Sequence, residues 1–263
     1  MICLRVAGGL GNQLFQISQA LKLADYDPSI IRIYTGDMHK YAQPRDYDIE
    51  RLLDVKLQQA DLVDSIVLQT RLPRLFRGSG MFVNDKNWLE YQSKSTRNHY
   101  VDGYFQYDQS WENLERSIGF LRERINPTFQ SSAPRSSLVI HARGGDFLVN
   151  DEVKFDAFRF YENAIKSIPV NKFASRKLVC SDKSFAVEVA NHLQTCGIFV
   201  DIFQESDEDW EESFKLLMNS SFLVGSKSTF AWWAAALGNV DCIFPTEFNN
   251  GRKKQLFLPG EIQ

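Results

Sequence analysis

The stretch ICLRVAGGLGNQLFQISQALKLA, residues 2–24, decides the expected fold. From Ile2 to Val6 every second residue is apolar, which is the period of a half-buried β-strand. From Leu14 to Ala24 the apolar residues recur at helical spacing, and glycines separate the two patterns. A strand that enters a glycine loop and then a helix is the usual beginning of an α/β fold.

The pattern continues beyond this beginning. A second short strand is expected at 30–34, and residues 36–100 are less regular, with helical stretches near 49–57 and 60–69. A further amphipathic helix is expected at about 109–125. The first half of the chain therefore predicts a β-loop-α-β lobe.

The segment NPTFQSSAPRSS, residues 126–137, is rich in proline and serine and indicates a linker. After it, strands and helices alternate almost without interruption, which predicts a parallel, doubly wound sheet. The strands are expected at 137–141, 177–181, 198–203, 221–225 and 241–244, and the helices at about 155–167, 183–195, 208–218 and 228–237. We therefore expect an α/β fold of two Rossmann-like lobes with a cleft between them, 1–130 and 131–245, with residues 246–263 as a tail that crosses back.

Composition narrows the class of protein. A hydrophobic content of 44% and a charged content of 24% are those of a soluble globular chain. A net charge of -3 argues against nucleic acid as the main partner, because nucleic acids require a basic surface. No apolar run reaches the ~18 residues of a membrane span, and the N-terminus does not have the pattern of a signal peptide.

The four cysteines, Cys3, Cys180, Cys196 and Cys242, are far apart in the sequence. We expect buried free thiols in a reducing compartment. A four-ligand zinc site requires closer spacing and nearby histidines, so no metal site is predicted.

Polar residues follow four of the expected strands. They lie in GGLGNQ (8–13), HARGGD (141–146), SDKS (181–184) and GSKSTF (225–230). In open α/β sheets, ligands bind at the carboxyl ends of the strands. We expect the four segments to converge on the cleft between the lobes.

GGLGNQ is a glycine loop before a helix. Gly9 and Gly11 let backbone amides approach a ligand, and the helix dipole favours an anion. The segment is not a dinucleotide fingerprint, because Leu14 occupies the third glycine position. A plain tight turn is the alternative.

HARGGD contains Arg143, whose guanidinium suits phosphate oxygens. Gly144 and Gly145 allow a ligand close to the backbone, and Asp146 can orient Arg143 or cap the next segment. The alternatives are a surface salt bridge with a turn and, for His141, a hydrogen-bonded structural histidine.

GSKSTF places Ser226, Ser228 and Thr229 before a helix, where hydroxyls and free amides can hold a phosphate. Capping of that helix is the alternative, and both roles are compatible. An Asp-x-Asp pair, Asp207 and Asp209, resembles a metal site, but it fits the first turn of a helix better.

Taken in order, these segments resemble the bacterial α-1,2-fucosyltransferases of glycosyltransferase family 11. The resemblance covers most of the chain, is loose over 36–100, and rests on the combination of its motifs. These are GGLGNQLFQ (8–16), GYFQYDQSW (103–111), IHARGGDF (140–147), FYENAI (160–165), CSD (180–182) and STFAWWAAAL (228–237).

The resemblance implies a GT-B-like fold and metal-independent transfer of L-fucose, with inversion, from GDP-fucose to the 2-hydroxyl of a galactose. It makes the first lobe the acceptor side and the second the GDP-sugar side. Arg143 would bind the β-phosphate of GDP, Asn12 would lie near the reaction centre, and Ser228 and Thr229 would hold phosphate. The donor-binding residues predicted are Gly9, Gly11, His141, Arg143, Asp146, Ser181, Asp182, Ser228 and Thr229, and the catalytic residues are Arg143, Asp151 and Asn12.

Asp151 is predicted as the general base because it lies shortly after the arginine motif on a loop expected to face the cleft. Glu152 beside it is a second candidate. No cofactor beyond the donor GDP-fucose is expected. The acceptor implied is a galactose-terminated glycan or lipid-linked oligosaccharide in O-antigen or capsule synthesis. The location implied is the bacterial cytoplasm, with peripheral association at the inner membrane.

The chain departs from the family where two adjacent arginines are usual, because Gly144 follows Arg143. Lys227, where serines are usual, can replace part of that charge. The departures leave two alternatives open. One is a transferase for another GDP-linked deoxysugar or another hydroxyl, and the other is a GDP- or glycan-binding module whose catalytic site has decayed.

Overall fold

The structure is a computed structural model of the whole chain. It describes residues 1–40, 45–70, 82–85, 99–106, 111–131, 135–144, 157–204 and 210–245. The chain divides into two compact units, Met1–Asn126 and Pro127–Gln263. The division falls at the start of the segment rich in proline and serine.

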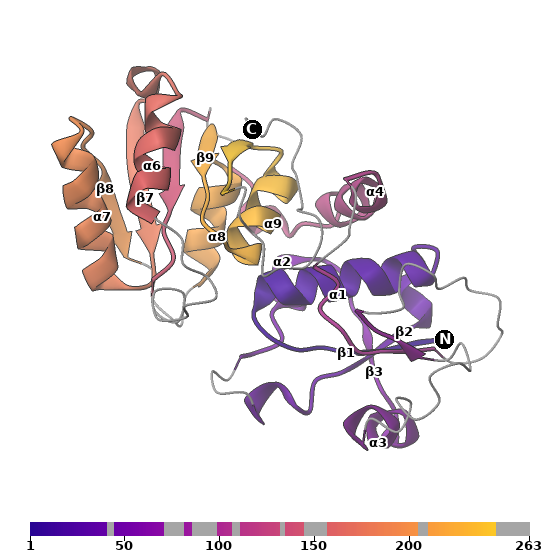
Figure 1. The fold of residues 1–263 in the computed structure, drawn as a ribbon. Helices are drawn as coiled ribbons and strands as arrows, with labels where there is room; N and C mark the ends of the chain where they lie inside the picture. Colours follow the sequence, from indigo (N-terminus) through magenta and orange to yellow (C-terminus); the bar gives the residue numbers. More distant parts are fainter. Residues whose placement is uncertain are drawn as a thin grey trace. The chain divides into compact units, whose positions relative to one another are not determined.

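The first unit is built on a five-stranded sheet in which all pairings are parallel (Figure 1). The strands in sheet order are β3 (Gln58–Gln59), β2 (Ile31–Tyr34), β1 (Ile2–Arg5), β5 (His99–Val101) and β4 (Phe82–Val83). In the register, Ile2 lies opposite Ile31 on one side and His99 on the other. The strand that opens the sequence is therefore the centre of this sheet.

Four α-helices of the first unit lie in the described part of the chain. They are α1 (Leu10–Leu23), α2 (Ile49–Leu52), α3 (Leu62–Thr70) and α4 (Trp111–Arg122). Helix α1 packs against β1, α2 and α4, and nearly all of its side chains are buried. This burial includes Gln13 and Gln16, whose amides bind backbone groups of the surrounding loops.

The helix expected at 49–57 is wrong beyond Leu52. Leu53, Val55 and Leu57 are buried, whereas Asp54 and Lys56 between them are exposed. This alternation has the period of an extended chain, and Leu53 forms an antiparallel bridge with Ile125. The sequence already contained this alternation, and the helical interpretation of the segment overlooked it.

Strands β3, β4 and β5 were not predicted either. They are two or three residues long and lie in the less regular part of the sequence, where no alternation with helices marks them. Their extended form depends on pairing with strands distant in sequence, as when β5 adds to β1. Propensity alone does not reveal such pairings.

The second unit contains another five-stranded parallel sheet. Its strands in sheet order are β10 (Asp241–Ile243), β9 (Phe222–Val224), β6 (Ser137–His141), β7 (Ser175–Cys180) and β8 (Asp201–Gln204). Its α-helices among the described residues are α6 (Ala157–Lys166), α7 (Lys183–Thr195), α8 (Trp210–Met218) and α9 (Thr229–Gly238). The elements expected for this half are confirmed, with small shifts at their ends.

Both faces of the second sheet are covered. Leu138 and Ile140 of β6 belong to one core cluster with side chains of α6 and α7. Val139, which alternation points to the other face, is also completely buried. On that side α8 packs against β6 and α9 packs against α8. The doubly wound α/β architecture predicted for this half is confirmed.

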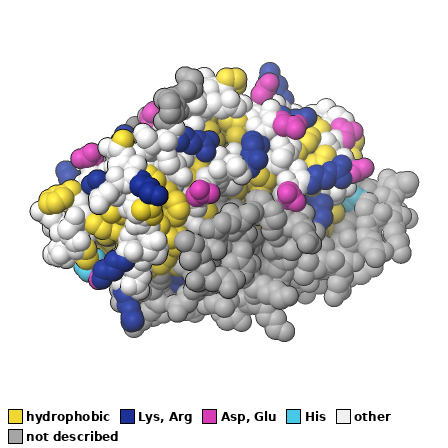
Figure 2. Space-filling view, turned by 90° about the horizontal axis from the view of Figure 1, so that it is seen from above, with side chains coloured by type: hydrophobic (Ala, Val, Ile, Leu, Met, Phe, Trp, Pro, Cys, Tyr) yellow, Lys and Arg dark blue, Asp and Glu magenta, His cyan; other side chains and the backbone are white. Residues whose placement is uncertain are grey.

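The cysteines are free thiols, as expected, and Cys3, Cys180 and Cys242 are buried. Cys196 is only half-buried, which the sequence pattern did not reveal. No helix in the described part of the chain is long and apolar enough to cross a bilayer. On the described part of the face in Figure 2, lysines and arginines are interspersed with acidic side chains and do not form a basic stripe.

Candidate functional site

The order of the second sheet reverses between β6 and β9. From β6 the chain builds outward through β7 to β8, and then returns to add β9 and β10 on the other side of β6. Such a reversal is a topological switch point, and ligands of doubly wound sheets bind at the carboxyl ends of the strands beside it. The segments that follow β6 and β9 therefore form the candidate site of this unit.

A hydrogen bond joins the two strands at the switch point. His141, the last residue of β6, has its Nδ1 2.8 Å from Oγ of Ser226, just after β9, and both side chains are buried. Burial, helped by the nearby charge of Arg143, lowers the pKa of His141 from 6.5 to about 3. His141 is therefore neutral at physiological pH and holds the two strand exits together.

Arg143 follows two residues after β6 and is partly exposed. The backbone before it is anchored, because Ala142 N donates to the carbonyl of Val179 (2.9 Å) and the Tyr161 hydroxyl donates to the carbonyl of His141 (3.2 Å). The guanidinium is thus carried by a fixed strand exit at the switch point. This is a suitable position for a group that must bind an anion.

Gly144 lies against Asp182, the residue before α7. A Cβ at position 144 would lie 2.6 Å from the Asp182 Cβ and 2.8 Å from its Oδ2. Asp182 is itself fixed, since its Oδ1 accepts from Phe185 N (3.1 Å) and Ser184 Oγ (2.7 Å) and caps α7. The segments that follow β6 and β7 can lie in contact because residue 144 has no side chain.

The segment after β9 begins α9. Ser228 is the N-cap of that helix, and its Oγ accepts from Ala231 N at 3.5 Å. Thr229 is the first helical residue, and the first amides of a helix point toward its N-terminus, where an anion is favoured. Lys227 is also buried here, so a second cationic side chain lies near the switch point.

The glycine loop of the first unit is held together by side chains of α1. Gly8 has a positive φ of 79°, and Gly9 is the N-cap residue of α1, while Gly11 is buried within it. Asn12 accepts at Oδ1 from Nε2 of Gln106 (2.7 Å). Two motifs that lie far apart in the sequence, GGLGNQLFQ and GYFQYDQSW, therefore meet at Asn12.

A buried ion cluster at the same edge of the first sheet was missed by the sequence analysis. Arg5 Nη2 lies 2.9 Å from Asp37 Oδ2, and Arg5 Nη1 lies 3.2 Å from Asp102 Oδ1. Arg5 ends β1, Asp37 lies shortly after β2, and Asp102 directly follows β5. The cluster therefore joins the carboxyl ends of three strands. The sequence did contain an indication of this cluster, because an arginine in an expected central strand requires buried acidic partners.

The structure divides the predicted residues into three groups. His141, Arg143, Asp182, Ser228 and Thr229 lie at the strand exits of the second unit, where Ser181 is exposed. Gly9, Gly11 and Asn12 lie at the glycine loop of the first unit. Asp146 and Asp151 lie outside the described residues, as do Asp207 and Asp209.

Comparisons with known proteins give a family for the sequence and relatives for the fold. The sequence model of the family described as "Glycosyl transferase family 11" matches residues 77–257. None of the curated proteins compared with the chain matches it. The matched range contains the segments after β5, β6, β7 and β9, and begins after the glycine loop.

Solved structures resemble the fold. Crystal structures of the fucosyltransferase NodZ from Bradyrhizobium, and of the NodZ alpha-1,6-fucosyltransferase soaked with GDP-fucose, each have a TM-score of 0.55 and 16% identity, covering 95% of this chain and 96% of theirs. The E. coli heptosyltransferase WaaC with ADP-2-deoxy-2-fluoro heptose has a TM-score of 0.50 and 13% identity, covering 99% of this chain and 91% of its own. These likenesses confirm the expected α/β fold of GT-B type.

Proposed function

The chain belongs to glycosyl transferase family 11, and on this premise we propose that it transfers L-fucose from GDP-fucose to a glycan acceptor. The acceptor atom proposed is the 2-hydroxyl of a galactoside. The donor is supported by the motifs shared with α-1,2-fucosyltransferases and by the fold, which resembles that of a fucosyltransferase whose crystal was soaked with GDP-fucose.

One observation carries the proposal. The switch point of the second unit holds Arg143 after β6, the His141–Ser226 bond between β6 and β9, and the first amides of α9. Together with Lys227, a second cationic side chain, which is buried, they offer a guanidinium and oriented amides at the carboxyl ends of the strands. A nucleotide diphosphate needs this combination of charge and directed N–H groups.

The same groups account for catalysis of the step. As the bond from the anomeric carbon of fucose to the phosphate oxygen breaks, GDP gains negative charge. Arg143 and the amides of α9 are fixed before the reaction and stabilise that charge as it develops. We propose that these groups make the transfer independent of a metal ion, with inversion at the anomeric carbon.

Asp151 remains the proposed general base for the acceptor hydroxyl, although it lies outside the described residues. In an Asp151→Asn variant the acidic limb of the pH–rate profile should disappear together with most of the turnover. An unchanged profile would exclude Asp151, and the neighbouring Glu152 would then be tested in the same way.

The linkage has to be determined directly, since the NodZ enzyme of similar fold forms an alpha-1,6 linkage. The purified protein is incubated with GDP-fucose and a panel of β-galactosides, and the product linkage is assigned by NMR. An α-1,2-fucosylated galactoside, formed equally with and without EDTA, is the expected product. Another linkage would correct the acceptor hydroxyl, and tight GDP binding without turnover would indicate a binding module instead.

The proposed setting is the cytoplasmic face of a bacterial inner membrane, with lipid-linked O-antigen or capsule intermediates as acceptors. It rests on the resemblance of the motifs to the bacterial enzymes. Fractionation of cells that express the protein tests it, because activity should be recovered in the cytosol and in salt-extractable membrane fractions. Activity confined to the medium or periplasm would contradict this setting.

A further inference from the structure

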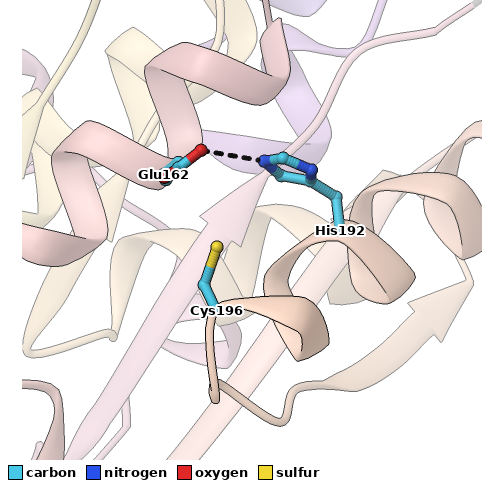
Figure 3. Close-up of side chains that lie close together, drawn as sticks. All are labelled: Glu162, His192 and Cys196. Atoms are coloured by element: carbon cyan, nitrogen blue, oxygen red, sulfur yellow. Dashed lines mark ion pairs between the residues drawn. The ribbon is translucent and has the colours of Figure 1, made fainter.

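Three potential metal ligands lie together on the helices that cover one face of the second sheet. Glu162 belongs to α6, His192 to the last turn of α7, and Cys196 is the residue that ends α7 (Figure 3). One oxygen, one nitrogen and one sulfur atom from these side chains all lie within 4.8 Å of one another. His192 and Cys196 are four positions apart, so they share a face of the helix.

The histidine nitrogen of this group has no aligned partner among the residues that the structure describes. Nε2 of His192 is shielded from solvent and makes no hydrogen bond with that part of the chain. Oε2 of Glu162 lies 3.3 Å away, close enough for an ion pair but not aligned as an acceptor. The ring is held in place by an edge contact with Phe158, at 5.3 Å between centroids.

The second oxygen of Glu162 already has a partner. Lys166, one turn further along α6, pairs with Oε1. This contact leaves Oε2 facing His192 and fixes the orientation of the carboxylate. Such an outer partner of a carboxylate is a common feature of metal sites, where it orients the ligand. The competing interpretation is a simple ion-pair chain of Lys166, Glu162 and His192 without a metal.

We propose that Glu162, His192 and Cys196 form a zinc site that joins α6 to α7. Imidazole, thiolate and carboxylate are the ligands that Zn²⁺ takes in proteins, and three of them leave a fourth position for water. Bonds of about 2.0–2.3 Å put neighbouring ligands of a tetrahedral ion roughly 3.3–3.8 Å apart. The ligand atoms, which lie within 4.8 Å of one another, therefore have to approach by at most about 1–1.5 Å, and Oε2 of Glu162 is already 3.3 Å from Nε2 of His192.

The site lies apart from the proposed donor groups. Asp182 caps the start of α7, whereas Cys196 ends it, and a helix of this length spans about 20 Å. A metal here can therefore stabilise the second unit by linking two helices, without contact to the transferred sugar. The inference does not depend on the proposed function and agrees with transfer that needs no metal.

The test uses the full-length protein after removal of metals. Titration with Co²⁺ should produce a thiolate-to-cobalt charge-transfer band and the visible bands of a tetrahedral ion, and Zn²⁺ should displace both. One equivalent of Zn²⁺ should also raise the Tm, because an ion that binds only the folded state stabilises it. Cys196→Ser should abolish the charge-transfer band, and His192→Gln should weaken Zn²⁺ binding about tenfold or more.

His39→Gln is the matched control, since His39 is exposed in the first unit. It should leave the cobalt spectrum and the zinc affinity unchanged. The proposal is overturned if the wild-type protein gives no thiolate band, or if Cys196→Ser binds Zn²⁺ as tightly as the wild type. The ion-pair chain would then be the role of these side chains. Fucosyl transfer, assayed in parallel, should not respond to any of the three substitutions.

Discussion

At the scale of single residues, Gly144 shows how a missing side chain can be a requirement of the site. In sequence it stands where the family usually has a second arginine. In the structure its Cα faces Asp182 so closely that a Cβ would approach the Asp182 Cβ to 2.6 Å. The cap of α7 by Asp182 therefore requires a glycine at position 144. Besides Arg143, the buried Lys227 after β9 supplies a second cationic side chain.

Gly144→Ala should displace Asp182 and weaken the cap of α7. We expect the free energy of unfolding to fall by about 1–3 kcal/mol, the usual cost of overpacking a fixed site. Urea denaturation measures it. Gly119→Ala on α4 is the control, because a Cβ there meets no atom within 4 Å in the described part of the chain, and a helical alanine should stabilise by up to about 1 kcal/mol. Equal effects of the two substitutions would refute the steric explanation.

His141 should make the stability of the protein depend on pH. Its pKa of about 3 in the folded state lies below the ordinary 6.5, so between these values only the unfolded chain binds the proton. The free energy of unfolding should therefore fall as the pH drops below 6.5, by up to about 1.4 kcal/mol per pH unit. Denaturation at several pH values should show a slope reduced by that amount in His141→Asn. An unchanged slope would assign the pH dependence to other groups.

At the scale of elements, buried glutamine amides fix the start of α1. Nε2 of Gln13 donates to the carbonyls of Gly8 (3.0 Å) and Asp46 (2.7 Å), and its Oε1 accepts from Asp48 N (3.0 Å). Oε1 of Gln16 accepts from Ala7 N at 3.0 Å. Two side chains of one helix thus satisfy backbone groups in the loop before α1 and in the segment before α2.

Gln13→Glu should test this arrangement with little change in shape. A carboxylate can still accept from Asp48 N but cannot donate to the two carbonyls, and its charge is buried. We expect a loss of about 2–4 kcal/mol in the free energy of unfolding. Gln59→Glu on the exposed β3 should change it by less than about 0.5 kcal/mol. A similarly small effect at Gln13 would show that the loops do not depend on its amide.

The elements also show where sequence reasoning succeeds. The second unit was predictable because its helices are long enough to display their period and alternate regularly with apolar runs, which mark even the three-residue strands β9 and β10. In the first unit no such alternation marks the short strands β3, β4 and β5, and their form depends on distant pairing. For the site, the strand exits that carry Arg143 and Ser228 were predictable from topology rules. The contacts between exits, such as His141 with Ser226, depend on the sheet order, which no local pattern contains.

At the scale of the whole molecule, each unit has its own parallel sheet, and the proposed donor groups at the switch point belong to the second. That unit has a core of its own, formed by the sheet with α6 and α7. A unit with a separate core can fold by itself. Binding of GDP should therefore be separable from transfer.

A fragment of residues 127–263 should bind GDP, measured by calorimetry, with no transfer to any acceptor. The fragment 1–126 should not bind GDP. Arg143→Ala in the longer fragment should weaken binding by roughly tenfold to a hundredfold, since it removes a charge-assisted contact to phosphate. Folding of each fragment is checked by circular dichroism. A folded fragment 127–263 that does not bind GDP would contradict the assignment of the donor site.

The position of β6 in the middle of its sheet has a consequence for how the protein is made on the ribosome. β6 is the first strand of this sheet to emerge and pairs with β7, to which β8 then adds, but the other edge of β6 waits for β9. His141 and its partner Ser226 are 85 positions apart, so the bond between them forms only when most of the chain has left the exit tunnel. Until then β6 presents an open edge, the kind that invites wrong pairing. The period of greatest risk to the nascent chain thus ends when β9 pairs with β6 and the proposed donor-binding groups come together.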